Sequence, residues 1–136
     1  MPRSDRAGVR ELLDRAEEHL RIDGDGGGDG VSLTRAYTAD SRTVGWYGPA
    51  PAGHRLAIDA EQSDATVPPA LAARYGPANF WARWTRAESL CKAYDLPILL
   101  WLRRYGLEVP HDRPARWRTL TIDDLTVSVA CVPLDR

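Results

Sequence analysis

The property that most constrains the fold is a change of hydrophobic period along the chain. Apolar residues recur every three or four positions over residues 7–22, which is typical of an amphipathic helix. Beyond the glycine-rich stretch 23–30, several segments alternate apolar and polar residues, which is typical of strands. Helical patterns then return before a closing pair of alternating segments. Strands, helices and a final hairpin in this order predict an α+β fold with a mostly antiparallel sheet packed against a long helix.

The positions of proline, glycine and apolar residues set the expected elements. The expected strands are residues 31–37, 42–48, 54–61, 117–122 and 125–132. The expected helices are residues 68–75, opened by two prolines, then 78–94 and 97–105. We therefore divide the chain into an N-terminal helix (1–22), a Gly/Asp-rich linker (23–30) and a domain (31–136). The aspartates of the linker resemble a calcium loop, but no closing glutamate follows, which favours a flexible connection.

Composition excludes several classes of protein. With 136 residues, 43% hydrophobic and 27% charged, the chain has the balance of one soluble globular domain. A net charge of −1 is unlike a generic basic nucleic-acid-binding protein. The longest apolar run, residues 96–102, is too short to cross a bilayer, and the charged N-terminus lacks the apolar core of a signal peptide. Two cysteines form no disulfide framework, so we expect a cytoplasmic protein.

Two carboxylates share one face of the expected strand 54–61. Asp59 and Glu61 lie two positions apart, and side chains at that spacing point the same way from a strand. Two acids on one face repel each other unless a cation lies between them, and a hard cation such as Mg²⁺ suits carboxylate ligands. The alternative is an acidic strand end that faces solvent.

A second group of residues forms a stripe on the expected helix 78–94. Trp81, Trp84, Glu88 and Lys92 follow at steps of three or four, so Glu88 and Lys92 should lie on or beside the buried face. Lys92 is also the only lysine among seventeen arginines. Since arginine cannot replace lysine everywhere, this position is a candidate for a role that needs an ammonium group. The alternative is a surface Glu–Lys pair of small energetic value.

Together these two segments resemble the signatures of the 4′-phosphopantetheinyl transferases. AIDAE (57–61) is similar to the family's apolar-Gly-apolar-Asp-apolar-Glu strand. WTRAESLCKA (84–93) is similar to its helical motif Trp-Ser/Thr-x-Lys-Glu-(Ala/Ser)-x-x-Lys. VSLTRA (31–36) falls where larger, surfactin-type members carry a Ser-Leu-Ser-His-Ser-like strand. The resemblance covers residues 31–132 and implies a transferase half-domain.

The resemblance implies transfer of the phosphopantetheine arm of coenzyme A to a serine of an acyl or peptidyl carrier protein, in polyketide or nonribosomal peptide synthesis. Asp59, Glu61 and Glu88 would hold Mg²⁺ on the diphosphate of coenzyme A. Lys92 would contact the phosphates, and Glu88 would help to deprotonate the attacking hydroxyl. Ser32 and Arg35 would contribute to coenzyme A binding together with Lys92. Such chemistry needs a metal, a cation and a base around the reacting phosphate.

Three departures from the family pattern separate two hypotheses. Ala87 stands where the family carries a lysine, and Arg35 where larger members carry a histidine. The chain is also half the size of the pseudo-dimeric surfactin-type enzymes, in which coenzyme A binds between halves, so we expect a homo-oligomer. The alternative is a degenerate homologue that binds a carrier protein, or acts on a carrier-tethered intermediate, without transferase activity. A small domain with no site is a third possibility.

Overall fold

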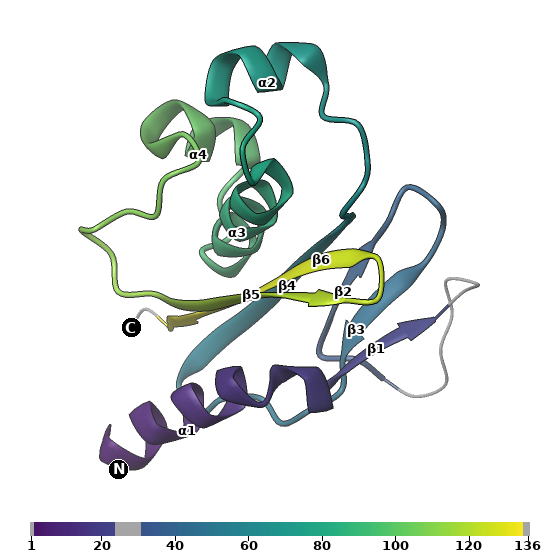
Figure 1. Ribbon diagram of the computed structural model, residues 1–136. Coiled ribbons are helices and arrows are strands. Elements are labelled where there is room, and N and C mark those ends of the chain that lie inside the picture. Colours follow the sequence, from purple (N-terminus) through teal and green to yellow (C-terminus); the bar gives the residue numbers. More distant parts are fainter. Residues whose placement is uncertain (1, 24–30, 135–136) are drawn as a thin grey trace.

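Four α-helices and six strands make up the described part of the chain, residues 2–23 and 31–134 of a computed structural model (Figure 1). The helices are α1 (Pro2–Asp14), α2 (Pro69–Tyr75), α3 (Phe80–Ala93) and α4 (Ile98–Tyr105), with a 3-10 turn at Ala16–Glu18. The strands are β1 (Leu20–Asp23), β2 (Thr34–Tyr37), β3 (Thr43–Trp46), β4 (His54–Gln62), β5 (Arg116–Ile122) and β6 (Leu125–Pro133). The expected α+β class is therefore confirmed. Among the described helices, none has the length and apolar character needed to span a membrane.

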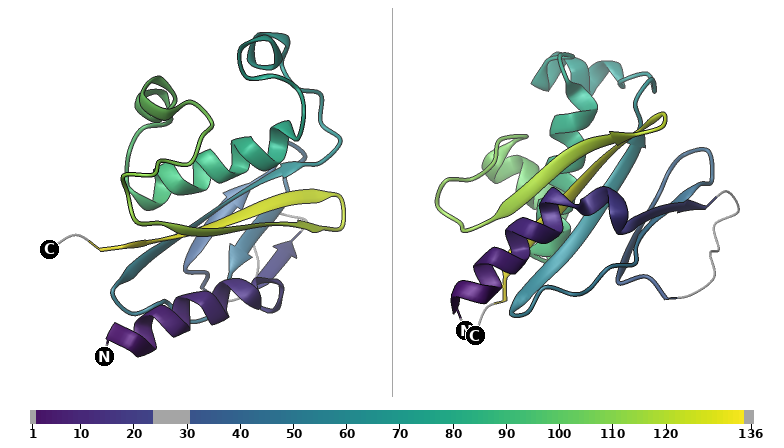
Figure 2. Two further views of the ribbon diagram at one scale, coloured as in Figure 1. Left: turned by 60° about the vertical axis from the view of Figure 1, so that its left-hand side comes forward. Right: turned by 60° about the horizontal axis from the view of Figure 1, so that its bottom comes forward.

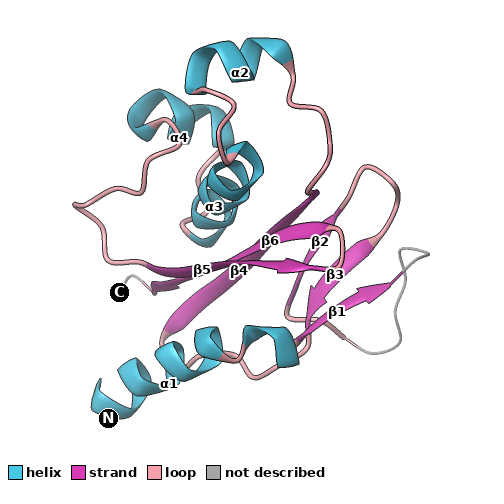
Figure 3. Ribbon diagram, in the orientation of Figure 1, coloured by secondary structure: helices cyan, strands magenta, loops and turns pink. Residues whose placement is uncertain are grey.

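The strands form two antiparallel sheets, where the sequence suggested one (Figure 3). Sheet A has the order β1-β3-β2, and sheet B has the order β4-β6-β5. The segment between β3 and β4 contains Pro49 and Pro51, which cannot donate to a ladder, so β3 and β4 do not continue as a hairpin. β4 instead pairs along its whole length with β6, from His54 opposite Pro133 to Gln62 opposite Leu125.

The N-terminal helix expected over residues 1–22 is partly wrong. α1 ends at Asp14, and the segment Leu20–Asp23 forms β1, antiparallel to β3. The sequence of this segment alternates apolar and polar residues, so it fits a strand as well as a helix. Pairing decides the outcome, because Leu20 lies opposite Trp46 and both side chains enter the same core.

The N-terminal segment is thus part of the same folded unit as the rest of sheet A. β1 is hydrogen-bonded to β3, and α1 packs beneath β5, where Arg118 donates to the main-chain oxygens of Leu13 and Asp14. The expected linker and its calcium-loop alternative fall mostly on residues 24–30, which lie outside the described residues.

The first hydrophobic core lies between the two sheets and α1 (Figure 2). One face of sheet B contributes alternate residues to it, and sheet A contributes its inner face. The buried members are Val9, Leu13, Ala16, Leu20, Ala36, Val44, Trp46, Leu56, Ile58, Ala60, Leu125, Val127, Val129 and Cys131. Since these alternate along β4 and β6, the residues between them must point to the opposite face of sheet B.

The second core lies on that opposite face, where α2, α3 and α4 gather (Figure 2). Ala57, Ala130 and Val132 of sheet B pack against Leu90 of α3 and Trp101 of α4. Sheet B is therefore covered on both sides, by helices above and by sheet A and α1 below. Asp59, which is on the same face of β4 as Ala57, therefore lies under α3.

Arg42 ties the two sheets together. From the turn before β3, its guanidinium donates to both carboxylate oxygens of Asp124, at 2.6 and 2.9 Å, and to Asp40 at 2.8 Å. Asp124 lies in the turn between β5 and β6. The contact joins residues that are 82 positions apart.

Candidate functional site

Asp59 and Glu61 point from β4 toward α3. They share a face with Ala57, which belongs to the second core, whereas Ile58 and Ala60 enter the first. The side chain of Asp59 is only 14% exposed, and Glu61 is half-buried. The alternative of an acidic strand end facing solvent is therefore wrong for Asp59.

α3 brings Lys92 to the same place. Its Nζ donates to the carbonyl oxygen of Ile58 at 2.8 Å and lies 3.8 Å from Oδ1 of Asp59. No ion pair forms between Glu88 and Lys92, although both lie on one stripe of α3. Lys92 therefore contacts β4 and does not form an ion pair with Glu88 on the surface of α3.

The buried face of α3 is made of smaller residues than the expected stripe. Trp81 and Trp84 are half-buried at the margin of the second core, while Thr85 and Ser89 are fully buried. Glu88 is half-buried at the edge of this face. The small residues let α3 approach sheet B closely, and this approach brings Lys92 within reach of β4.

The carboxyl groups of Asp59, Glu61 and Glu88 form one electrostatic unit with Lys92, which we call the acidic cluster. Burial raises the pKa of Asp59 well above its usual range, Lys92 opposes this, and Glu88 and Glu61 add to it. Burial also raises the pKa of Glu88, again opposed by Lys92. The pKa of Glu61 is raised by burial and by Glu88. Each group therefore responds to a neighbour in the cluster.

The acidic cluster also affects Cys91 on α3. Burial raises the pKa of this thiol to about 12, and the charges of Glu88 and Asp59 add to the shift. A thiol with such a pKa is not a thiolate at neutral pH, so Cys91 is not a nucleophile there. Both Cys91 and Cys131 are buried, as expected for core residues.

The donor set of the acidic cluster suits a hard divalent cation. Oδ2 of Asp59 is buried and has no hydrogen-bond partner, and an ion would satisfy it. However, among the side chains described for residues 8–23 and 31–134, no three of His, Cys, Asp or Glu are arranged to share a metal ion. Glu88 lies close enough to raise the pKa of Asp59 and of Glu61, but the three acids do not form a preformed three-ligand site.

Ser32 and Arg35 lie elsewhere, on and beside β2. Nε of Arg35 donates to Oγ of Ser32. No hydrogen bond or ion pair joins either residue to the acidic cluster in the described part of the chain. The structure therefore groups the predicted site residues into two sets, four at β4 and α3 and two at sheet A.

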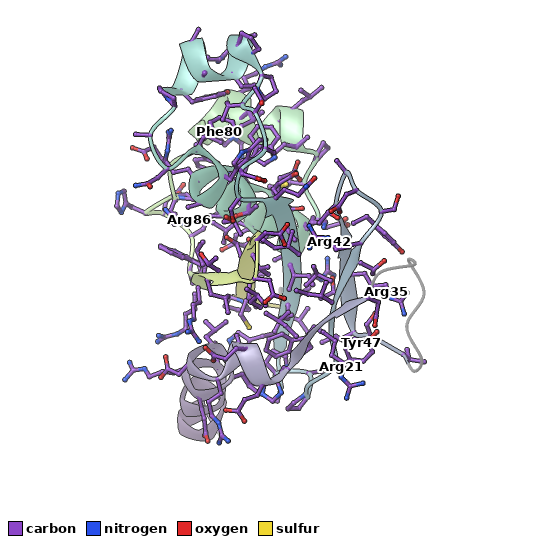
Figure 4. The ribbon with its side chains drawn as sticks, turned by 45° about the vertical axis from the view of Figure 1, so that its right-hand side comes forward. Arg21, Arg35, Arg42, Tyr47, Phe80 and Arg86 are labelled. Carbon is purple, nitrogen blue, oxygen red and sulfur yellow. The ribbon has the colours of Figure 1, made fainter. Side chains whose placement is uncertain are left out.

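Arg21 and Tyr47 join the sheet A set, and sequence reasoning missed them. Arg21, Gly45 and Arg35 form one cross-strand row, and the Arg21 guanidinium lies 4.7 Å from the centre of the Tyr47 ring. A Cβ at Gly45 would lie 2.8 Å from the Tyr47 ring, so the ring covers the glycine. These arginines and Tyr47 lie together at sheet A, away from Phe80 and Arg86 of α3 (Figure 4). The alternation within residues 20–23 was the signal for Arg21.

A second missed feature is a set of hydroxyl groups beside the acidic cluster. Ser128 of β6 lies opposite Asp59, and its Oγ is 2.8 Å from Oγ1 of both Thr85 and Thr119. In the next row, Thr126 lies opposite Glu61. The alternation of Thr and Ser with apolar residues in the closing hairpin was the available signal.

Comparison of the chain with protein-family models, with curated proteins and with solved structures gave no match in any of the three.

Proposed function

We propose that this protein transfers the 4′-phosphopantetheine arm of coenzyme A to a carrier-protein serine, with Mg²⁺, and that its fold is a phosphopantetheinyl transferase-like half-domain. The proposal depends on one observation: two segments that separately resemble the family's motifs lie next to each other in the structure. AIDAE on β4 and WTRAESLCKA on α3 bring Asp59, Glu61, Glu88 and Lys92 into one cluster. A chance likeness of two short segments gives no reason for their charged residues to meet.

The acidic cluster supplies the residue types that this transfer needs. Asp59, Glu61 and Glu88 would hold Mg²⁺, with water and substrate oxygens completing its coordination, because Mg²⁺ often keeps only one or two protein carboxylates. The bound ion would neutralise charge on the diphosphate of coenzyme A. Lys92 is anchored near Asp59 and 39% exposed, so its ammonium can reach a phosphate at the surface of the cluster.

Glu88 is the candidate base. The serine oxygen forms a new bond to the phosphorus that carries the pantetheine arm, and the diphosphate P–O bond breaks to release adenosine 3′,5′-bisphosphate. The serine proton passes to the carboxylate of Glu88. A raised pKa brings this group closer to working pH, which favours proton transfer in the transition state.

Sheet A offers a place for the phosphate at the far end of coenzyme A. Arg35 is oriented by Ser32, and Arg21 lies in the same cross-strand row. Guanidinium groups bind phosphate through parallel hydrogen bonds. Because one half-size chain supplies one wall of a cleft that lies between halves in the resembling enzymes, we propose that a second copy completes it.

The degenerate-homologue alternative is favoured by one observation. The described residues hold no preformed three-ligand metal group, and the family's additional lysine is absent at Ala87. Under this alternative the chain binds a carrier protein without transferring the arm.

Intact-mass measurement of an apo carrier protein incubated with coenzyme A and Mg²⁺ tests the proposal. The wild type should add the arm. Lys92→Arg should slow the addition by about 10²–10³, because a planar guanidinium cannot replace the compact ammonium at a developing phosphate charge. Arg103→Lys, an exposed change on α4, is the matched control and should react as the wild type does.

Two outcomes contradict the proposal in different ways. If the wild type binds carrier proteins but modifies none of them, the degenerate-homologue alternative stands. If Lys92→Arg modifies the carrier as fast as the wild type, the ammonium has no role at the phosphate. Light scattering on the active sample tests self-association, and an active monomer would refute the shared cleft.

A further inference from the structure

A groove of about 430 Å³ opens beside the acidic cluster, between the start of α3 and the β5–β6 hairpin. Its volume falls within the range of about 300–1,000 Å³ that small-molecule sites occupy. Its lining includes Ser63, Val67, Trp81, Thr119, Thr121 and Thr126. None of them belongs to the acidic cluster.

Strand register joins the groove to the acidic cluster. Thr126, which lines the groove, is the cross-strand partner of Glu61, and Thr121 is the next partner in that row. Thr119 also lines the groove, and it shares Ser128 with the row of Asp59. A ligand with one end at the carboxylates can therefore extend over the hydroxyl groups.

The lining is polar but almost uncharged. Ser63, Thr119, Thr121 and Thr126 can each donate and accept a hydrogen bond. The indole N–H of Trp81 is already bonded to the Ala65 carbonyl at 2.8 Å, so this residue offers its ring edge and face rather than a donor. Val67 and Ala82 add apolar surface.

Such a lining suits a neutral chain in which amide or hydroxyl groups alternate with methylene and methyl groups. A phosphate would find no cation in this groove, since the charged side chain among its lining residues is the carboxylate of Asp64. A flat apolar ligand would make no use of the remaining hydrogen-bonding capacity of these hydroxyl groups. The pantetheine arm, with two amides, one hydroxyl and a dimethyl carbon, matches the lining.

We propose that this groove holds the pantetheine arm of the substrate, an inference that rests on the proposed function for the identity of the ligand. The phosphate end of the arm lies at the acidic cluster. The neutral remainder extends over Thr126 and Thr121 toward Trp81 and Ser63. Ser63 and Thr126, whose hydroxyl oxygens are 2.8 Å apart, present a paired donor and acceptor to an amide.

The test is a titration of the ¹⁵N-labelled full chain with pantetheine, without phosphate or carrier protein, followed by NMR. We expect saturable shifts at the Trp81 indole N–H and at the Thr121 and Thr126 amides. Ser63→Ala and Thr121→Val should each weaken binding about threefold to tenfold, because each removes one neutral hydrogen-bonding group. Ser41→Ala, an exposed serine in the turn before β3, is the matched control and should bind as the wild type does.

The outcomes separate this inference from the proposed function. Pantetheine binding that the two groove variants weaken supports the groove even if no carrier protein is modified. Shifts that avoid the groove, or variants that bind with wild-type affinity, overturn the inference even if transfer occurs. Maltose, a neutral polyhydroxyl probe, is titrated in parallel. If it shifts the groove resonances and pantetheine does not, the groove binds a sugar-like ligand and the inference is wrong.

Discussion

Sheet A and sheet B each consist of three antiparallel strands, yet the faces that point away from the first core differ. Sheet B carries α3 on that face, and its acids Asp59 and Glu61 have raised pKa values. No helix of the described residues packs on the corresponding face of sheet A, where the exposed Arg21 stacks on Tyr47. Whether a helix packs on the face of a sheet, rather than the sequence of the strand, determines which charged residues are desolvated.

The comparison explains why the acidic cluster is the better candidate for chemistry. A charged group in water changes little on folding, whereas a group beneath a helix must find a partner or change its protonation. Lys92 reaches Asp59 only because α3 lies close to β4. The four predictions below test this dependence, from the largest expected effect to the smallest.

Weakening the packing of α3 on sheet B should have the largest effect on the free energy of unfolding. Leu90 of α3 is fully buried in the second core, so Leu90→Ala should lower the free energy of unfolding by about 2–5 kcal/mol. Urea denaturation measures the change. Leu99→Ala, on a side chain that is 75% exposed, is the matched control and should change little. A loss below 1 kcal/mol for Leu90→Ala would show that α3 is not held to sheet B by this core.

Crowding near the edge of sheet A should have the next largest effect. A Cβ at Gly48 would lie 2.4 Å from Cγ of His19, whose ring packs 5.0 Å from that of Trp46. Gly48→Ala should therefore cost about 1–3 kcal/mol, as expected for an overpacked site. Gly8→Ala, where a Cβ meets nothing within 4 Å, is the control. Thermal unfolding that ranks the two variants in the opposite order would contradict this account.

Neutralising a covered acid should stabilise the protein, with a definite dependence on pH. Because burial raises the pKa of Asp59, the folded state holds its proton more tightly than the unfolded state does. The free energy of unfolding therefore falls as the pH rises above the ordinary aspartate pKa of about 3.9. Asparagine carries no charge at any of these pH values, so the Asp59→Asn variant avoids the cost of burying a carboxylate. It should be more stable than the wild type at pH 7.5 by about 1 kcal/mol, which is a usual gain for a single stabilising substitution.

The gain from Asp59→Asn should shrink as the pH falls to 4, where the wild-type carboxyl is protonated in the folded state. Urea denaturation at both pH values measures this trend, with the exposed Asp112→Asn as the control. A gain that stays constant with pH would have another origin than the charge of Asp59.

Removing the charge of Arg21, on the face of sheet A that no described helix covers, should have the smallest effect on the free energy of unfolding. Arg21→Gln should change the free energy of unfolding by about 0.5 kcal/mol or less, since an exposed cation–π contact is weak. Arg118→Gln should cost more, because Arg118 also holds the carbonyls of Leu13 and Asp14 and the carboxylate of Glu17. Equal costs in urea denaturation would remove the distinction between open and structural arginines.

Most of the fold could be predicted from local patterns. Alternation indicated β4, β5 and β6, and prolines and glycines indicated the ends of α2 and α4. What local patterns could not give is the pairing. The division into two sheets depends on the pairing of β4 with β6 rather than with β3. The structure of residues 20–23 depends on a partner strand twenty or more positions away.

The candidate site was predicted in part for the same reason. Spacing two apart on a strand and four apart on a helix is local, so Asp59 with Glu61, and Glu88 with Lys92, could be paired from the sequence. That Lys92 turns to Ile58 and Asp59 depends on how closely α3 approaches sheet B. The hydroxyl groups opposite the acids escaped notice because the register of β4 against β6 cannot be read from either strand alone.

The order of strands also governs how the chain can fold during synthesis. Sheet A can form once residue 46 has emerged, because its three strands all lie within residues 20–46. Sheet B cannot, because its central strand β6 is the last to be made, and β4 must wait about seventy residues for it. Contacts between distant segments form slowly, and an unpaired strand is open to wrong partners while it waits. Of the three strands of sheet B, the strand that carries Asp59 and Glu61 is therefore the first to be translated and the one that waits longest for its hydrogen-bonded neighbour.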